Sequence, residues 1–88
     1  MKIKEGFVKR EVMGKTVIVP TGEAGKTVSG MIKLNRTAAF IWDSVEAGKT
    51  VEETAECMKE TFEIPMETAL SDTEKIVAQM KEAGVFED

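Results

Sequence analysis

Histidine is absent from this sequence, and cysteine occurs once, as Cys57. Without histidine the chain lacks the commonest general base and the commonest zinc ligand. A single cysteine cannot form an internal disulfide, and a catalytic thiol ordinarily needs a histidine partner. We therefore expect no catalytic residue, no metal site and no cofactor, and we interpret Cys57 as a small, partly buried helix residue.

Long apolar runs are also missing. The longest, such as residues 38–42, span four to five residues, whereas a membrane helix needs about 20. The N-terminus carries lysines with no apolar run behind them, so it does not have the pattern of a signal peptide. We expect a cytoplasmic protein with no membrane partner, and a length of 88 residues predicts one domain, 1–88.

Charge is unevenly distributed along the chain. Residues 1–36 carry eight Lys or Arg and three Glu, a net charge of +5, whereas residues 37–88 carry four Lys and thirteen acids, a net charge of −9. Such asymmetry indicates either two faces with different partners or a basic part and an acidic part that merely keep the protein in solution. Both interpretations remain open.

The first part of the chain has the pattern of strands. Residues 7–12 alternate in polarity and end at Gly14, residues 15–19 are rich in β-branched side chains and end at Pro20, and residues 27–34 form a third candidate. Short turns between three such segments predict an antiparallel meander.

The remainder has the pattern of helices. Asn35 is a suitable N-cap for a helix over 36–47, whose apolar stripe includes Trp42, so we expect Trp42 in the core. Thr50 and Glu53 form a capping box at the start of a second helix, and a third helix spans 66–83. We expect Val85 and Phe86 to fold back onto the core. The order β-β-β-α-α-α indicates an α+β fold, a three-stranded antiparallel sheet followed by a three-helix bundle.

Two motifs suggest nucleotide or nucleic-acid binding but do not fit. Ala-Gly-Lys-Thr occurs at 24–27 and 47–50, yet a P-loop needs a further glycine where Pro20 and Asp43 stand. Helices beside a sheet suggest a winged helix that reads DNA. The expected third helix, however, carries four acids against two lysines and would repel phosphates. We expect no nucleic-acid partner and keep a DNA-binding or adaptor winged helix as the alternative.

The third strand is an edge of the expected meander. It carries one charge, Lys33, while Gly30 leaves its backbone accessible. An edge of this kind can accept a peptide as an additional strand. The other interpretation is that a helix or a second copy covers it. Met31 is the methionine that we most expect to face a ligand.

Residues 30–42, with the pattern Leu-Asn-x-Thr-Ala-x-x-Ile-Trp, resemble the signature of PqqD-like proteins. Residues 48–53, 62–65 and 83–86 resemble the same family, and the likeness extends over about 17–86. The resemblance implies a winged-helix-like fold. It also implies a non-catalytic module that captures the leader segment of a ribosomally synthesised precursor peptide and presents it to a modifying enzyme, usually a radical SAM maturase. We expect this chain to act in trans.

In this family the leader adds to the third strand and packs against the third helix. Carried onto this chain, the resemblance implies a binding site made of Ser29, Gly30, Met31, Ile32, Lys33 and Leu34, with the outward side chains of Leu70, Thr73, Glu74, Val77 and Lys81. The choice of helix face follows from periodicity. A small structural subunit of a larger enzyme is a third function, which differs in having no free peptide ligand.

Overall fold

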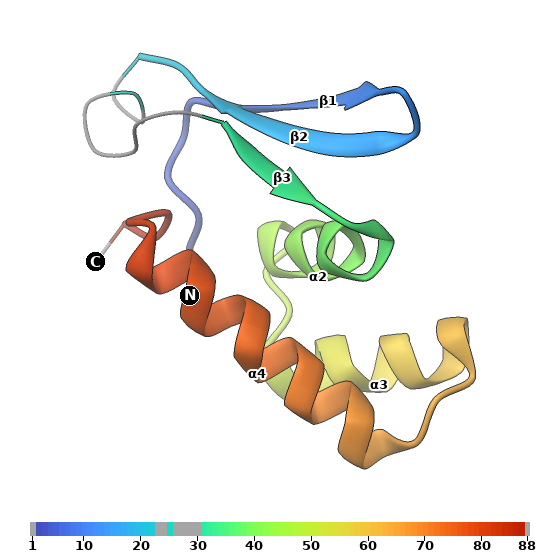
Figure 1. Ribbon diagram of the computed structural model, residues 1–88. Helices are drawn as coiled ribbons and strands as arrows, with labels where there is room; N and C mark the ends of the chain where they lie inside the picture. Colours follow the sequence, from blue (N-terminus) through green and yellow to red (C-terminus); the bar gives the residue numbers. More distant parts are fainter. Residues whose placement is uncertain (1, 23–24, 26–30, 88) are drawn as a thin grey trace.

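The computed structural model describes residues 2–22, 25 and 31–87. Its sheet consists of β1 (Phe7–Val12), β2 (Lys15–Pro20) and β3 (Ile32–Leu34), which are antiparallel neighbours in the order β1-β2-β3 (Figure 1). The meander is therefore confirmed. The third strand was expected over 27–34; residues 27–30 lie outside the described residues, and the described strand begins at Ile32.

A tight turn joins β1 to β2. Met13 and Gly14 both have positive φ, 52° and 79°, as in the type I′ turn whose twist matches that of the flanking strands. Glycine adopts this backbone conformation readily, whereas a methionine in it is strained. The β1–β2 hairpin is called the wing below. In Figure 1 it extends over α2.

Three helices follow the sheet: α2 (Arg36–Glu46), α3 (Val51–Phe62) and α4 (Met66–Glu82). The expected helix starts are confirmed. The Asn35 side chain accepts the Ala38 N–H at 2.8 Å. At the start of α3, the Thr50 N–H donates to Glu53 and the Glu53 N–H donates to Thr50, which completes the capping box.

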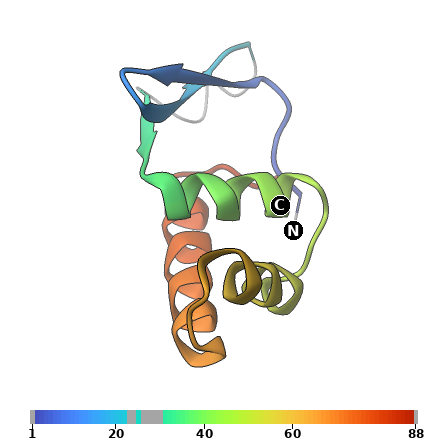
Figure 2. The same cartoon turned by 90° about the vertical axis from the view of Figure 1, so that its right-hand side faces the viewer.

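The helix α2 lies between the sheet and the α3–α4 pair, as Figure 2 shows. Its inner face places Ile41 and Trp42 in the core, where Trp42 is 1% exposed, as expected. Phe7 of β1 meets the Trp42 indole edge to face, with ring centroids 5.5 Å apart. This contact attaches the wing to the helices through apolar burial.

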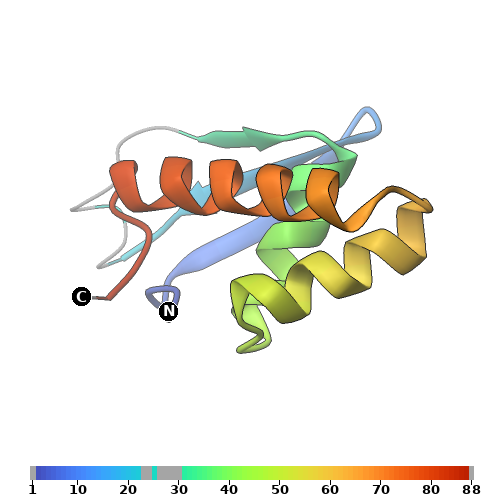
Figure 3. The same ribbon diagram turned by 90° about the horizontal axis from the view of Figure 1, so that it is seen from below.

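The two described ends of the chain meet. Ile3 pairs with Phe86, and the Lys4 N–H donates to the carbonyl oxygen of Val85 at 2.9 Å. Figure 3 shows these ends beside each other. Val85 and Phe86 are both buried, so the return of the C-terminal segment onto the core is confirmed. Over the described part of the chain, no helix combines the length and the apolar character that crossing a bilayer requires.

Candidate functional site

The wing determines which peptide groups of β3 face outward. In a two-residue hairpin the residues that flank the turn, here Val12 and Lys15, form a hydrogen-bonded pair. Such pairs alternate with non-hydrogen-bonded pairs along an antiparallel ladder. Lys15 therefore directs its peptide groups toward β1, and Thr16 directs its own toward β3. The pairs between β2 and β3 are Thr16↔Leu34, Val17↔Lys33 and Ile18↔Ile32.

Lys33 consequently has its N–H and C=O on the free edge of the sheet. Ile32 and Leu34 oppose residues of β2 that face them, whereas Lys33 opposes Val17, which faces β1. Because β3 is the last strand of the described sheet, the peptide groups of Lys33 point away from every described strand. A donor and an acceptor on one residue are what an incoming strand needs in order to pair with this edge.

A mainly apolar groove runs beside this edge, with α4 on one side and β3 and the start of α2 on the other. Two adjoining cavities, of about 170 and 190 Å³, form it. Figure 3 shows α4 alongside β3, with α3 on the other side of α4. We call this feature the β3–α4 groove; its lining residues are Ile32, Lys33, Leu34, Asn35, Thr37, Ala38, Asp72, Lys75, Ile76, Gln79, Met80 and Ala83.

The side chains of β3 divide between the core and solvent. Leu34 is buried and Ile32 is partly buried against the core, on the same face of the strand. Lys33 points to the other face and is exposed. Met31, which immediately precedes the strand, is 62% exposed, so it is free to contact a ligand at this edge. Alternation thus leaves both the backbone edge and an apolar strand face beside the groove.

The structure places the predicted strand residues and the predicted helix residues differently. Ile32, Lys33 and Leu34 line the groove. Ser29 and Gly30 lie outside the described residues. Five residues of α4 were expected to face the groove, and none of them lines either of its two cavities. They are Leu70, Thr73, Glu74, Val77 and Lys81.

The outward placement of Thr73 and Val77 is wrong. Thr73 is 0% exposed and Val77 is 6% exposed, and both belong to the interior. Leu70 is partly buried against the core, and Glu74 and Lys81 are exposed on other parts of α4. The physical reason is that α4 has two apolar stripes, and the stripe with Thr73 and Val77 packs into the core.

The helix residues that do line the groove are spaced as one helical face. Ile76, Gln79, Met80 and Ala83 follow the spacing i, i+3, i+4 and i+7. Met80 is 4% exposed, while Ile76 is only partly buried. The signal that could have identified this face is the partly apolar spacing from Ile76 to Ala83.

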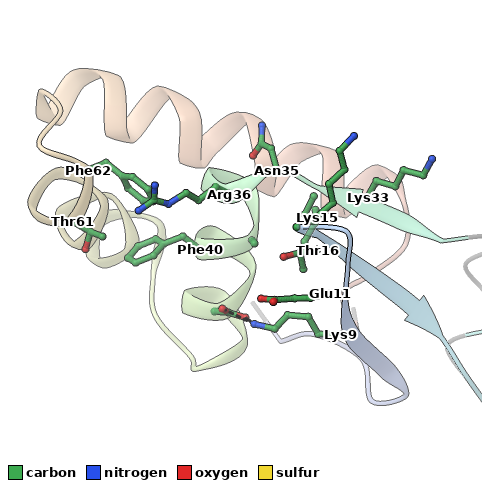
Figure 4. A pocket seen from close by; sticks show the side chains of 14 residues that line it. Lys9, Glu11, Lys15, Thr16, Lys33, Asn35, Arg36, Phe40, Thr61 and Phe62 are labelled. Carbon is green, nitrogen blue, oxygen red and sulfur yellow. Dashed lines mark hydrogen bonds and ion pairs between the residues drawn. The ribbon is translucent and has the colours of Figure 1, made fainter.

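A larger hollow of about 720 Å³ lies between the wing and the helices α2 and α3. Figure 4 shows its side chains, and we call it the wing hollow. Its lining residues are Lys9, Glu11, Gly14, Lys15, Thr16, Lys33, Leu34, Asn35, Arg36, Ala39, Phe40, Asp43, Thr61 and Phe62. Sequence reasoning did not identify this hollow as a site.

Two interactions shape the wing hollow. The Lys9 ammonium donates to both carboxylate oxygens of Asp43 at 2.8 Å, and this hydrogen bond raises the pKa of Lys9 above its ordinary value. The Arg36 guanidinium lies 5.4 Å from the centre of the Phe62 ring, which in turn meets Phe40 edge to face. The hollow thus combines an aromatic wall with a cation held over it.

Metal ligands are not gathered in either place. Across residues 2–22, 25 and 31–87, no three Cys, Asp or Glu side chains come together as a metal site would require. What the arrangement can do chemically is bind: the edge offers backbone hydrogen bonds, and the groove offers apolar contact.

The model of the family described as coenzyme PQQ synthesis protein D matches residues 15–85. The chain belongs to the PqqD family. The matched range includes β2, β3 and all three described helices, and therefore every residue of the β3–α4 groove. The resemblance noted from the sequence is confirmed.

Two solved structures resemble this PqqD-family chain over nearly its full length. TbiB1, in complex with the TbiA(beta) leader peptide, is 18% identical with a TM-score of 0.78; the match covers 99% of this chain and 95% of TbiB1. Lasso peptide synthetase B1, complexed with the leader peptide, is 19% identical with a TM-score of 0.74, and coverage is 94% and 92%. At these identities the likeness shows a shared fold. A comparison with curated proteins gives no significant match.

Proposed function

We propose that this chain binds the leader segment of a ribosomally synthesised precursor peptide as an additional strand on β3. In this role it presents the precursor to a peptide-modifying enzyme, such as a radical SAM maturase, and itself makes or breaks no bond. Because such precursors are made in the cytoplasm, the proposed role places the chain there.

The observation that carries the proposal is the free edge of β3 beside an apolar groove. Lys33 offers an outward N–H and C=O, and Ile76, Met80 and Ala83 line the opposite wall. In strand addition, main-chain hydrogen bonds supply affinity and side-chain pockets supply specificity. The two solved structures described above are complexes with leader peptides, and the family match includes the whole groove.

The proposed complex would be held by backbone hydrogen bonds and by apolar contact. The Lys33 N–H would donate to a leader carbonyl oxygen, and the Lys33 C=O would accept from a leader N–H. An apolar leader side chain would enter the groove, where removal of its surface from water stabilises the complex at roughly 25 cal/mol per Å² before the costs of ordering the peptide. Peptide and protein would therefore form a four-stranded sheet.

Charge disfavours the DNA-binding alternative. The helix α4 carries Glu67, Asp72, Glu74 and Glu82 against Lys75 and Lys81, and α3 carries four Glu against Lys59. A recognition helix must approach phosphates, and phosphate neutralisation supplies most non-specific affinity. These two helices would repel the duplex that they should contact.

Amide hydrogen exchange tests the proposal directly. The probes are synthetic peptides that cover the leader segments of short precursor-like genes neighbouring the gene of this chain. Without a peptide the Lys33 amide faces solvent, so we expect rapid exchange. A bound leader should slow exchange at Lys33 and leave the solvent-facing amides of the wing unchanged. A peptide that binds with no protection at Lys33 would exclude strand addition to β3.

A further inference from the structure

The wing hollow and the β3–α4 groove meet at β3, where Lys33, Leu34 and Asn35 line both of them. The rest of the hollow is lined by the wing, α2 and α3, and by none of the described residues of α4. The rest of the groove is lined by Ile32, α4 and the start of α2, and by none of the described residues of β1, β2 or α3. Since β2 occupies the inner edge of β3, a leader added to the outer edge leaves the hollow open.

The hollow has a surplus of positive charge around an aromatic wall. It is lined by four cationic and two acidic side chains, a surplus of two positive charges, although the chain as a whole is negative. Within the described ranges, Lys9 is the one cation of the four with a carboxylate partner, Asp43. Figure 4 shows Arg36 extended along Phe62, with Phe40 beside them. This chemistry matches an acidic segment that carries a large apolar side chain.

The wing turn beside the hollow exposes an apolar side chain at a conformational cost. Met13 is 98% exposed and has φ 52°, and the next residue, Gly14, lines the hollow. Asparagine or glycine fits the first position of a type I′ turn better than methionine does. A residue that breaks a local folding rule without burying any surface is expected at a functional site. Met13 is thus an exposed apolar residue adjacent in sequence to the lining of the hollow.

We propose that the wing hollow, together with Met13, is a second docking site, which takes an acidic segment of the peptide-modifying enzyme with a large apolar side chain. The inference rests on the proposed function, because it supposes a modifying enzyme. A carrier must hold the leader and be recognised by the enzyme at the same time, and the part of the hollow formed by the wing, α2 and α3, which does not line the groove, allows both contacts. The leader, the enzyme and this chain then form a ternary complex.

The experiment measures how tightly each variant binds the leader peptide. It also measures how tightly each variant binds the purified modifying enzyme that is encoded beside the gene of this chain. The test variant is Arg36→Glu. Arg36 is exposed and is the first residue of α2, where a carboxylate interacts favourably with the helix dipole, so the fold should be retained. Arg10→Glu is the matched control, since Arg10 is exposed, does not line the hollow and undergoes the same charge change.

We expect Arg36→Glu to weaken enzyme binding at least ~10-fold, since a like charge replaces a complementary one, while leader affinity changes less than ~2-fold. Met13→Asn should weaken enzyme binding in the same direction, and Arg10→Glu should have little effect. If Arg36→Glu leaves the affinity for the enzyme unchanged, the proposal is overturned. It is also overturned if the wild-type chain does not bind the enzyme. Equal losses of enzyme affinity in Arg36→Glu and Arg10→Glu would mean that overall charge, and not the wing hollow, determines binding, which also overturns the proposal.

The leader titration separates this inference from the proposed function. If Arg36→Glu weakens leader and enzyme binding together, the hollow belongs to the leader site and the second docking site is excluded. If the wild-type chain binds the enzyme through Arg36 but no leader, the proposed function fails while the enzyme-docking surface stands.

Discussion

The hydroxyl of Thr73 lies 3.3 Å from the sulfur of Met58, inside the interface between α4 and α3. The same hydroxyl donates to the carbonyl oxygen of Ala69 at 2.8 Å, so its polar group has a partner in the core. Both Thr73 and Met58 are 0% exposed. This side of α4 therefore holds the helices together, and the side that carries Ile76 is the one available to a ligand.

Two carboxylate substitutions at neighbouring positions of α4 should affect different properties, one the stability of the fold and the other the affinity for the leader. Val77→Asp places an unpaired charge in the core, where an uncompensated buried charge costs on the order of 3–5 kcal/mol. Most of the stability of a small domain is then lost. Ile76→Asp should remain folded and weaken leader binding by more than ~100-fold, because the bound leader would bury the carboxylate.

Circular dichroism melts and leader titrations measure the two effects. Ala78→Asp, at an exposed position of the same helix, is the control and should cost less than about 1 kcal/mol. Glu56→Ala, on the solvent face of α3, should leave leader affinity within about 0.5 kcal/mol. A folded Val77→Asp protein that has lost leader binding, beside an Ile76→Asp protein that binds normally, would show that the site is on the other face of α4.

Sequence alone could predict the elements and the helix starts because these depend on local chemistry. The side chains of Asn35, Thr50 and Glu53 accept hydrogen bonds from backbone N–H groups three residues away. Such local patterns can be recognised in the sequence whatever the tertiary fold. Trp42 shares a stripe with other apolar residues of α2, and that stripe packs inward as expected.

The face of α4 that meets β3 could not be predicted in the same way. One stripe includes Thr73 and Val77, and a second includes Ile76 and Met80. Periodicity states which residues share a face, but it does not state which neighbour that face meets. The crossing of α4 with α3 and β3 decides this, and it depends on contacts between residues far apart in the sequence.

The wing hollow was missed for a related reason. Arg36 and Phe40 lie four residues apart on α2, but Phe62 comes from α3 and Lys9 from β1. Only the tertiary fold brings these side chains together. The one local signal was that Phe40 lies outside the inward stripe of α2, and a single partly exposed phenylalanine needs no functional explanation.

The capping box predicts a component of acid sensitivity. The hydrogen bond from the Thr50 N–H lowers the pKa of Glu53 below its ordinary value of 4.5. A carboxyl whose pKa is lower in the folded state stabilises the fold above its unfolded pKa, and this contribution is lost as the pH falls through the folded pKa. We therefore expect part of the decrease in Tm below about pH 4.5 to come from Glu53.

Glu53→Gln isolates this contribution from the other carboxyl groups. A glutamine can accept the same Thr50 N–H but does not titrate. The difference in Tm between the two proteins, measured from neutral to acid pH, should favour the wild type at neutral pH and diminish in acid. A difference that stays constant over the range would show that the hydrogen bond does not depend on the charge of Glu53.

The wing turn predicts a stabilising substitution. Met13→Asn replaces a strained left-handed methionine with the residue that the first position of a type I′ turn prefers. Since the side chain is 98% exposed, no packing is lost. We expect a gain of about 0.5–1 kcal/mol, which corresponds to several degrees in Tm for a domain of this size. Gly14→Ala should do the opposite, because Gly14 has φ 79° and alanine is strained there. A Met13→Asn protein that melts below the wild type would exclude turn strain.

The direction of the peptide groups in β3 predicts that a proline has different consequences at neighbouring positions. At Lys33 the N–H points to the free edge, so Lys33→Pro removes a donor that no described strand uses, and edge strands tolerate such a proline. At Ile32 the N–H points to β2, so Ile32→Pro breaks the native ladder and should lower Tm. We expect Lys33→Pro to remain folded and to lose leader binding, whereas Lys33→Ala, which keeps the N–H, should bind within a few fold of the wild type. Titration of the same leader peptide with all three proteins, each checked by circular dichroism, measures this. Full-affinity binding by a folded Lys33→Pro protein would mean that the leader does not pair with β3 at this residue.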